Sequence, residues 1–157
     1  MSFISKNELA NFDFSDCVCT EFKREKDSIS LTLEGLIVKA NNSQNSNFTD
    51  SYSDVAICIL DKVEVLAVLK EGYTRYDAND NVVEEVLDDP IAPSEYGELY
   101  KLINGAYLVR FFRTKEDYLL EFELPCEEGD MPDAYEFRID ASNVTITWDK
   151  YLNRVQN

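Results

Sequence analysis

Alternation of apolar and polar residues is the feature that most restricts the fold of this chain. In residues 28–34, Ile29, Leu31 and Leu33 alternate with serine, threonine and glutamate. Side chains two apart on a strand share one face, so this period predicts a strand with one buried and one hydrated face. Similar alternation occurs in residues 107–112, 118–124, 135–139 and 144–148. These segments predict a mostly antiparallel β-sheet, because antiparallel strands commonly bury one face only.

Three further stretches extend this sheet. Residues 54–60 are apolar on both faces, which predicts a central strand, and the β-branched content of residues 63–69 favours a strand over a short helix. Residues 12–22 precede residues 28–34 across a short charged segment, so the two stretches predict a hairpin. Gly35 then interrupts the alternation, where we expect a bend or bulge.

One segment, residues 94–104, has the signature of a helix. Pro93 precedes it, Leu99 and Leu102 supply part of an apolar stripe, and Gly105 is placed to end it. A chain of 157 residues is long enough for one domain with a real core. We therefore expect an α+β fold that forms a single globular domain over residues 1–157, with a mostly antiparallel sheet and one clear helix.

Asparagine and serine dominate residues 41–53, and apolar residues are few there. Such a composition is typical of turns and surface loops, because short polar side chains bond to their own backbone. We expect a surface loop that is mobile.

The sequence also bears on the compartment. The opening residues lack a basic region followed by an apolar run, which argues against a signal peptide, and no window approaches 18 consecutive apolar residues. The four cysteines are too sparse for a disulfide-stapled domain, so we expect reduced thiols. A cytoplasmic location is the resulting expectation.

Charge and the absence of histidine restrict the function. The chain has 31 acidic and 15 basic residues, a net charge of −16 and no histidine. Such an excess repels phosphate backbones and anionic lipid head groups but attracts cationic surfaces, so we expect neither a nucleic acid nor a membrane as partner. Missing histidine removes the commonest general base and transition-metal ligand. We therefore expect a binding protein that is not an enzyme, and assign no catalytic, cofactor or metal residues.

The acids are concentrated in two windows that contain no lysine or arginine, residues 77–98 and residues 116–136. We interpret them as a landing surface for a basic protein partner, because carboxylates steer association with cationic surfaces. The alternative is that they are solvated faces that only maintain solubility. Tyrosines lie among the acids at positions 96, 100, 118 and 135. They are suited to a binding surface, because their rings supply buried area at low entropic cost, but inward packing is the favoured interpretation. The candidate partner-binding residues are Asp77, Asp80, Glu84, Glu85, Asp88, Asp89, Glu127, Glu128, Asp130 and Asp133.

Three alternative interpretations stay open. Asp77, Asn79 and Asn81 have the spacing that opens an EF-hand calcium loop, which makes residues 77–88 an alternative calcium-binding module. However, Val82 stands where that loop needs glycine, and Asp88 stands where a bidentate glutamate is usual. An Asn/Asp hairpin turn is therefore the favoured interpretation. A hydrolase that uses a pair of carboxylates is the second alternative, and a domain without any ligand is the third.

The two ends of the chain carry a family resemblance. The opening Phe12-Asp-Phe-Ser-Asp16, the charged turn after it, the alternating strand 29–33 and a closing strand that ends at Trp148 resemble small acidic immunity proteins of bacterial polymorphic-toxin systems. The resemblance implies a single-domain cytoplasmic protein that binds and blocks a toxin without catalysis. It includes no diagnostic motif, so it assigns no role to any numbered residue.

Overall fold

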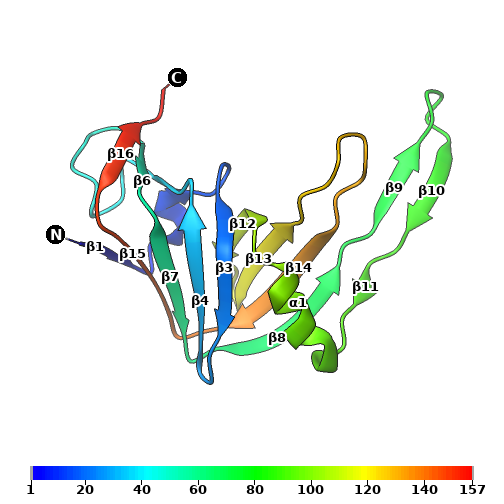
Figure 1. Ribbon diagram of the computed structural model, residues 1–157, viewed down its shortest axis with the longest axis horizontal. Helices are drawn as coiled ribbons and strands as arrows, with labels where there is room; N and C mark the ends of the chain where they lie inside the picture. Colours follow the sequence, from blue (N-terminus) through cyan, green and yellow to red (C-terminus); the bar gives the residue numbers. More distant parts are fainter. Residues whose placement is uncertain (1, 157) are drawn as a thin grey trace.

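A computed structural model describes residues 2–156 as one antiparallel β structure with a single α-helix (Figure 1). This confirms the expected α+β fold with mainly antiparallel sheet. The main sheet has ten strands, each antiparallel to its neighbours. In spatial order they are β1 (Phe3–Lys6), β15 (Asn143–Trp148), β7 (Ala56–Asp61), β4 (Ser28–Glu34), β3 (Val18–Arg24), β12 (Ala106–Arg113), β13 (Tyr118–Glu123), β14 (Ala134–Asp140), β8 (Glu64–Lys70) and β11 (Asp89–Pro90).

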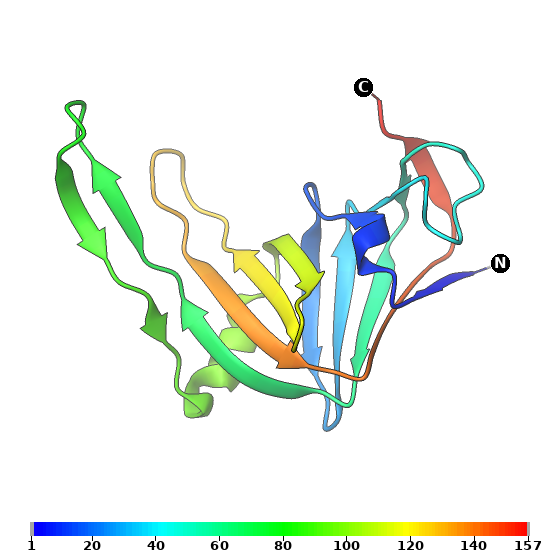
Figure 2. The same ribbon diagram turned by 180° about the vertical axis from the view of Figure 1, so that it is seen from behind.

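The main sheet bends into two halves that face each other (Figures 1 and 2). One half runs from β1 to β3 and the other from β12 to β11, and β3 pairs with β12 through only two residues of each strand. At the opposite corner the chain changes halves twice, from β7 to β8 and from β14 to β15. Phe22 of β3 contacts Phe122 of β13 and Phe137 of β14 at ring-centroid distances of 6.0 and 5.9 Å. The core therefore lies between the halves.

The helix contributes to this core. A 3-10 turn, η2 (Pro93–Glu95), leads into α1 (Tyr96–Leu102), so the predicted helix at 94–104 is confirmed with slightly different ends. Leu99 and Ile103 are buried, and Tyr100 stacks on Phe22 with ring centroids 4.8 Å apart. The expected inward packing of the four tyrosines is confirmed, because all four pack in or against the core. No helix within residues 2–156 is long and apolar enough to cross a membrane.

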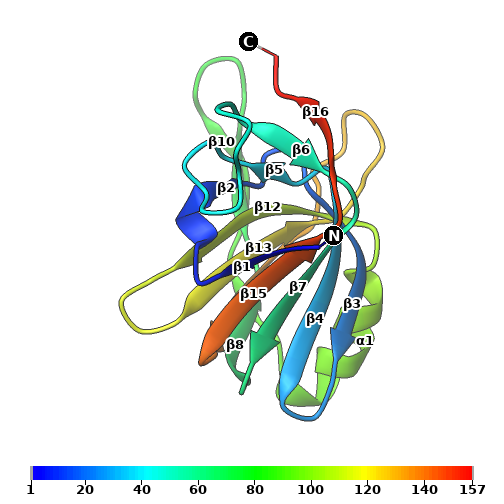
Figure 3. The same ribbon diagram turned by 90° about the vertical axis from the view of Figure 1, so that its left-hand side faces the viewer.

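A second, four-stranded sheet lies beside the first half, near the two termini (Figure 3). Its strands are β16 (Tyr151–Arg154), β6 (Ser51–Ser53), β5 (Ile37–Val38) and β2 (Phe12–Asp13), and the 3-10 turn η1 (Leu9–Asn11) precedes β2. The prediction that residues 12–22 form one strand of a hairpin is therefore wrong in its first part. Phe12 belongs to the second sheet, and only β3 pairs with β4.

Hydrogen bonds connect the loop at residues 41–53 to neighbouring segments of the chain. Its last residues form β6, and the side-chain amide of Asn45 donates to the carbonyls of Val38, Lys39 and Thr49 at 3.0 to 3.1 Å. Asn42 is buried and donates to the Ser5 hydroxyl. Mobility of this loop stays a prediction.

A two-stranded arm, residues 73–86, projects from the second half of the sheet (Figures 1 and 2). It consists of β9 (Tyr73–Tyr76) and β10 (Val82–Val86), which continue β8 and β11 away from the core. The Asn/Asp segment between them forms the predicted turn, and no residue of the arm is buried. The arm is therefore held to the molecule only through its base.

Candidate functional site

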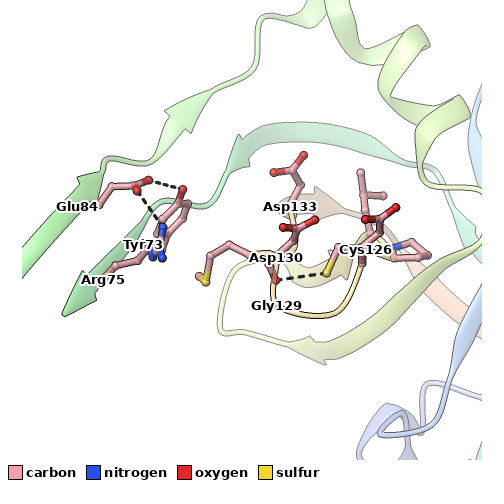
Figure 4. Close-up of a pocket in the computed structure, with 11 residues that line it drawn as sticks. Tyr73, Arg75, Glu84, Cys126, Gly129, Asp130 and Asp133 are labelled. Carbon is pink, nitrogen blue, oxygen red and sulfur yellow. Dashed lines mark hydrogen bonds and ion pairs between the residues drawn. The ribbon is translucent and has the colours of Figure 1, made fainter. Parts of the chain in front are cut away.

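The two acidic windows meet at a cleft between the arm and the acidic loop, residues 124–133, which joins β13 to β14 (Figure 4). The ribbons of the arm and the acidic loop project from the same end of the sheet (Figure 1). The cleft has a volume of about 740 Å³. Its carboxylates come from both walls: Glu84, Glu127, Asp130 and Asp133.

On the arm wall, Glu84 is held in one orientation. Tyr73 and Arg75 are two apart on β9 and share a face, and β10 places Glu84 opposite Arg75. The Tyr73 hydroxyl donates to Oε1 of Glu84 at 2.6 Å, and the Arg75 guanidinium donates to Oε2 at 3.2 Å. The bond from Tyr73 is the main reason that the pKa of Glu84 is lowered, and it raises the pKa of Tyr73. Glu84 is therefore a fixed anion.

On the other wall, a turn positions the acids of the loop. The backbone of Asp130 donates to the carbonyl of Glu127 at 3.1 Å, and Gly129 provides the left-handed backbone that this turn needs, with φ of 88°. Asp133 lies at the base of the loop, with its Oδ1 3.4 Å from the Lys70 ammonium. Figure 4 shows Asp130 and Asp133 across the cleft from the arm.

The cleft is suited to cationic side chains. Four carboxylates line it, and Arg75, the only lysine or arginine in its lining, is already paired with Glu84. Leu124, Met131 and the ring of Tyr73 add apolar surface. Lysine and arginine have long apolar stems below a charged head group, so such a lining matches both parts of their side chains.

Six of the ten residues predicted as a partner surface lie outside the cleft lining: Asp77, Asp80, Glu85, Asp88, Asp89 and Glu128. Asp88 accepts a hydrogen bond from the backbone of Gly72 at 2.7 Å, and Asp89 lies in β11 opposite Lys70. Asp88 therefore stabilises the base of the arm through this hydrogen bond. The other members of the set are exposed on the arm or on the turn of the acidic loop.

The Asp77 carboxylate is used by its own turn. Its Oδ1 accepts hydrogen bonds from the backbones of Asn79 and Asn81 at 2.8 and 3.0 Å, and these bonds lower its pKa. The flanking segments are strands, where an EF-hand has helices. Within residues 2–156, no three acidic or cysteine side chains converge as a metal site would require. Calcium binding by residues 77–88 stays a prediction without geometric support.

Several cleft residues were not predicted from the sequence, notably Tyr73, Arg75, Met131 and Cys126. The spacing of Tyr73 and Arg75 along a strand beside an acidic window was the available signal. Cys126 is exposed, whereas the other three cysteines are buried, and all four are free, as expected.

The observation that distinguishes the cleft is the convergence of acids from two distant segments around a single paired guanidinium. Comparison with known proteins adds no relative, because no family model, no curated protein and no solved structure matches the chain.

Proposed function

We propose that this chain is a non-enzymatic binding protein whose acidic cleft engages a basic surface of another protein. The observation that carries the proposal is the meeting of the two acidic windows at one cleft, with four carboxylates on two facing walls. A cleft lined mainly by one sign of charge concentrates the field between its walls, which speeds association with an oppositely charged partner.

A protein suits this site better than a small cation. The arm carries exposed apolar side chains next to its acids, including Tyr76, Val82, Val83 and Val86. Apolar groups rimmed by charge are typical of protein interfaces, where their burial stabilises a complex that charge has steered together. A small cation would leave these side chains in water.

Neutralisation of a toxin is the most specific form of this proposal. The family resemblance of the sequence supports it, and so does the absence of histidine from the chain. Toxins that act on nucleic acids need a basic surface to bind phosphates, and an acidic cleft is complementary to such a surface. A cytoplasmic location accompanies this proposal.

Co-purification with the product of an adjoining gene tests the proposal. We expect a complex at about 50 mM salt that weakens strongly at about 500 mM, because salt screens exposed charges. The absence of a complex, or a complex that is insensitive to salt, would contradict the electrostatic proposal.

A charge-matched pair of variants separates a specific cleft from general acidity. The cleft variant combines Glu127→Gln, Asp130→Asn and Asp133→Asn. The control removes the same types of acid from exposed positions elsewhere: Asp27→Asn, Glu34→Gln and Asp140→Asn. We expect the cleft variant to weaken binding about tenfold or more and the control to change it little. Equal effects would favour acids that serve solubility alone.

Cys126 offers a direct readout of cleft occupancy. It lines the cleft and is the only exposed cysteine of the four, and burial raises the pKa of Cys17 and of Cys19 to about 12. Iodoacetamide should therefore modify Cys126 selectively, since thiolates are the reactive form. We expect the partner to slow this reaction. Unchanged labelling in the complex would place the interface elsewhere.

A further inference from the structure

A second pocket, of about 600 Å³, lies apart from the cleft and shares no lining residue with it. It opens where β12 runs past the start of β3. Only the first residues of β12 pair with β3. The 3-10 turn η1 packs beside the other end of β12. The pocket therefore lies between the far end of β12 and the second sheet. We call it the aromatic pocket; the residues that matter below are Leu9, Phe12, Lys39, Phe111, Arg113 and Tyr118.

Apolar side chains form the walls of the aromatic pocket. Leu9, Phe12, Phe111 and Tyr118 are all buried, and Phe111 meets Tyr118 edge to face with ring centroids 6.3 Å apart. The hydroxyl of Tyr118 forms no hydrogen bond with any group of residues 2–156, and although only 5% of the residue is exposed, this oxygen is not among the side-chain atoms closed off from solvent. It is therefore accessible to a ligand, with which it can donate or accept a hydrogen bond.

The charge of the aromatic pocket is opposite to that of the cleft. Lys39 and Arg113 line it, and no carboxylate does. Within residues 2–156 neither cation lies within 4.0 Å of an acid. The Arg113 guanidinium lies 4.7 Å from the centroid of the Tyr118 ring, and Lys39 donates to the Ala10 carbonyl at 3.2 Å, which leaves two of its N–H groups free.

Two acids that lie nearby in the chain, Glu8 and Asp117, are engaged elsewhere. Glu8 accepts hydrogen bonds from Ser5, Asn11 and Ser43. Asp117 accepts from Thr114 and pairs with Arg138 at 3.4 Å. Neither carboxylate lines the pocket, so its two cations stay available in a strongly acidic chain.

We propose that the aromatic pocket binds a small amphipathic organic anion, a carboxylate or sulfonate on an aromatic or short alkyl body. Its anionic group would lie at Lys39 and Arg113, and its apolar body against Phe12, Phe111 and Tyr118. The pocket volume lies within the usual range for small ligands, and its mixture of apolar walls with a few polar groups is typical of such sites. This proposal does not depend on the proposed function of the cleft.

Two fluorescent probes with similar aromatic bodies test it. 1-Anilinonaphthalene-8-sulfonate carries a negative charge, and N-phenyl-1-naphthylamine is neutral. A chain of net charge −16 repels anions in general, so preference for the sulfonate requires a local cationic site. We expect one equivalent of the sulfonate to bind, and the neutral amine to bind about a hundredfold more weakly, the difference expected from two charge-assisted hydrogen bonds, one to Lys39 and one to Arg113. Equal affinities would overturn the proposal.

Variants locate the binding. Arg113→Gln and Lys39→Gln should each weaken the sulfonate about tenfold and leave the neutral amine unaffected, whereas the control Lys26→Gln should change neither. Ala10 is exposed and lines the pocket, so Ala10→Trp should block both probes without disturbing the core. Thermal unfolding verifies that each variant is folded. Sulfonate binding that survives Ala10→Trp, or that does not respond to either charge variant, would contradict the assignment.

Discussion

Gly72 is the residue on which attachment of the arm depends. A Cβ atom at this position would overlap the carbonyl oxygen of Val86 and lie 2.6 Å from the carbonyl carbon of Leu87. Both are backbone atoms of the returning strand, so they cannot rotate away. We predict that Gly72→Ala destabilises the protein by about 1 kcal/mol, as mild overpacking does, measured by urea unfolding.

Gly97 provides the matched control for that substitution. It lies in α1, and a Cβ there would meet nothing within 4 Å. Gly97→Ala should raise stability by up to about 1 kcal/mol, because alanine favours the helix and restricts the unfolded chain. Equal effects of the two substitutions would show that the close approach at Gly72 has no energetic consequence.

Glu71, next to that glycine, should make stability depend on pH. Burial, the hydrogen bond with Glu121 and the charges of Glu121 and Glu136 raise the pKa of Glu71 to about 8, and Arg110 opposes the shift. Burial raises the pKa of Glu121, but the hydrogen bonds from Glu71 and Arg110 outweigh burial, so the pKa of Glu121 is lowered. The folded protein thus keeps a proton on Glu71 that the unfolded chain releases near the ordinary value of 4.5. Stability therefore falls as pH rises between these two values.

Glu71→Gln isolates this effect, because glutamine cannot ionise and still donates a hydrogen bond. We predict that wild type and variant are similarly stable at about pH 5, and that the wild type is less stable by about 1 kcal/mol at about pH 9. Solvent screening keeps this difference well below the value that the full pKa shift would give. Urea unfolding over this range measures the difference, and parallel pH profiles would contradict a shared proton.

At the scale of elements, the alternation of apolar and polar residues identified most strands, but it could not predict which strands pair with one another. Residues 54–60 and 63–69 were correctly predicted as strands and appear as β7 and β8. β7 is central, yet its outer face is not fully covered, since Ile59 is 37% exposed. Only two residues separate β7 from β8, and β14 from β15, but neither pair is hydrogen-bonded. Short connections usually join neighbours, so these changes of half depend on long-range packing that a local pattern does not encode.

The candidate site was likewise only partly predictable. Composition located both acidic windows, but their meeting depends on two local events far apart in the chain. One is the continuation of β8 into the arm, and the other is the turn at Gly129 that directs the acidic loop toward the arm. Residues such as Glu85 and Glu128 share the composition of the windows but do not line the cleft, because neighbouring side chains on a strand or turn diverge.

The arm should be dispensable for folding. None of its residues is buried, and the core of the second half is complete without it. We predict that replacing residues 73–86 with Asn-Gly, which favours a tight hairpin, changes the free energy of unfolding by less than about 1 kcal/mol. Circular dichroism during thermal unfolding measures this. The shortened chain should also lose the salt-sensitive partner of the intact protein, whereas a loss of cooperative unfolding would assign the arm to the core.

At the scale of the whole molecule, net charge opposes folding. A charge of −16 is distributed over an accessible surface of 9388 Å², and the cleft brings four carboxylates together with one paired guanidinium. Folding compresses these charges relative to the unfolded chain, so their repulsion lowers stability. Sodium ions screen that repulsion, with a Debye length that shortens from about 30 Å at 0.01 M to about 3 Å at 1 M.

We therefore predict that raising sodium chloride from about 10 mM to about 500 mM stabilises the protein by about 1 kcal/mol, a rise in Tm of about 2–4 °C for a chain of this size. The variant Glu127→Gln, Asp130→Asn, Asp133→Asn should be more stable at low salt and gain less from added salt, because part of the repulsion is already removed. The control with Asp27→Asn, Glu34→Gln and Asp140→Asn has the same net charge as this variant. Comparing the two therefore separates repulsion among the cleft acids from the effect of total charge. If both variants lose the same part of the salt effect, the acids of the cleft repel no more strongly than isolated surface acids.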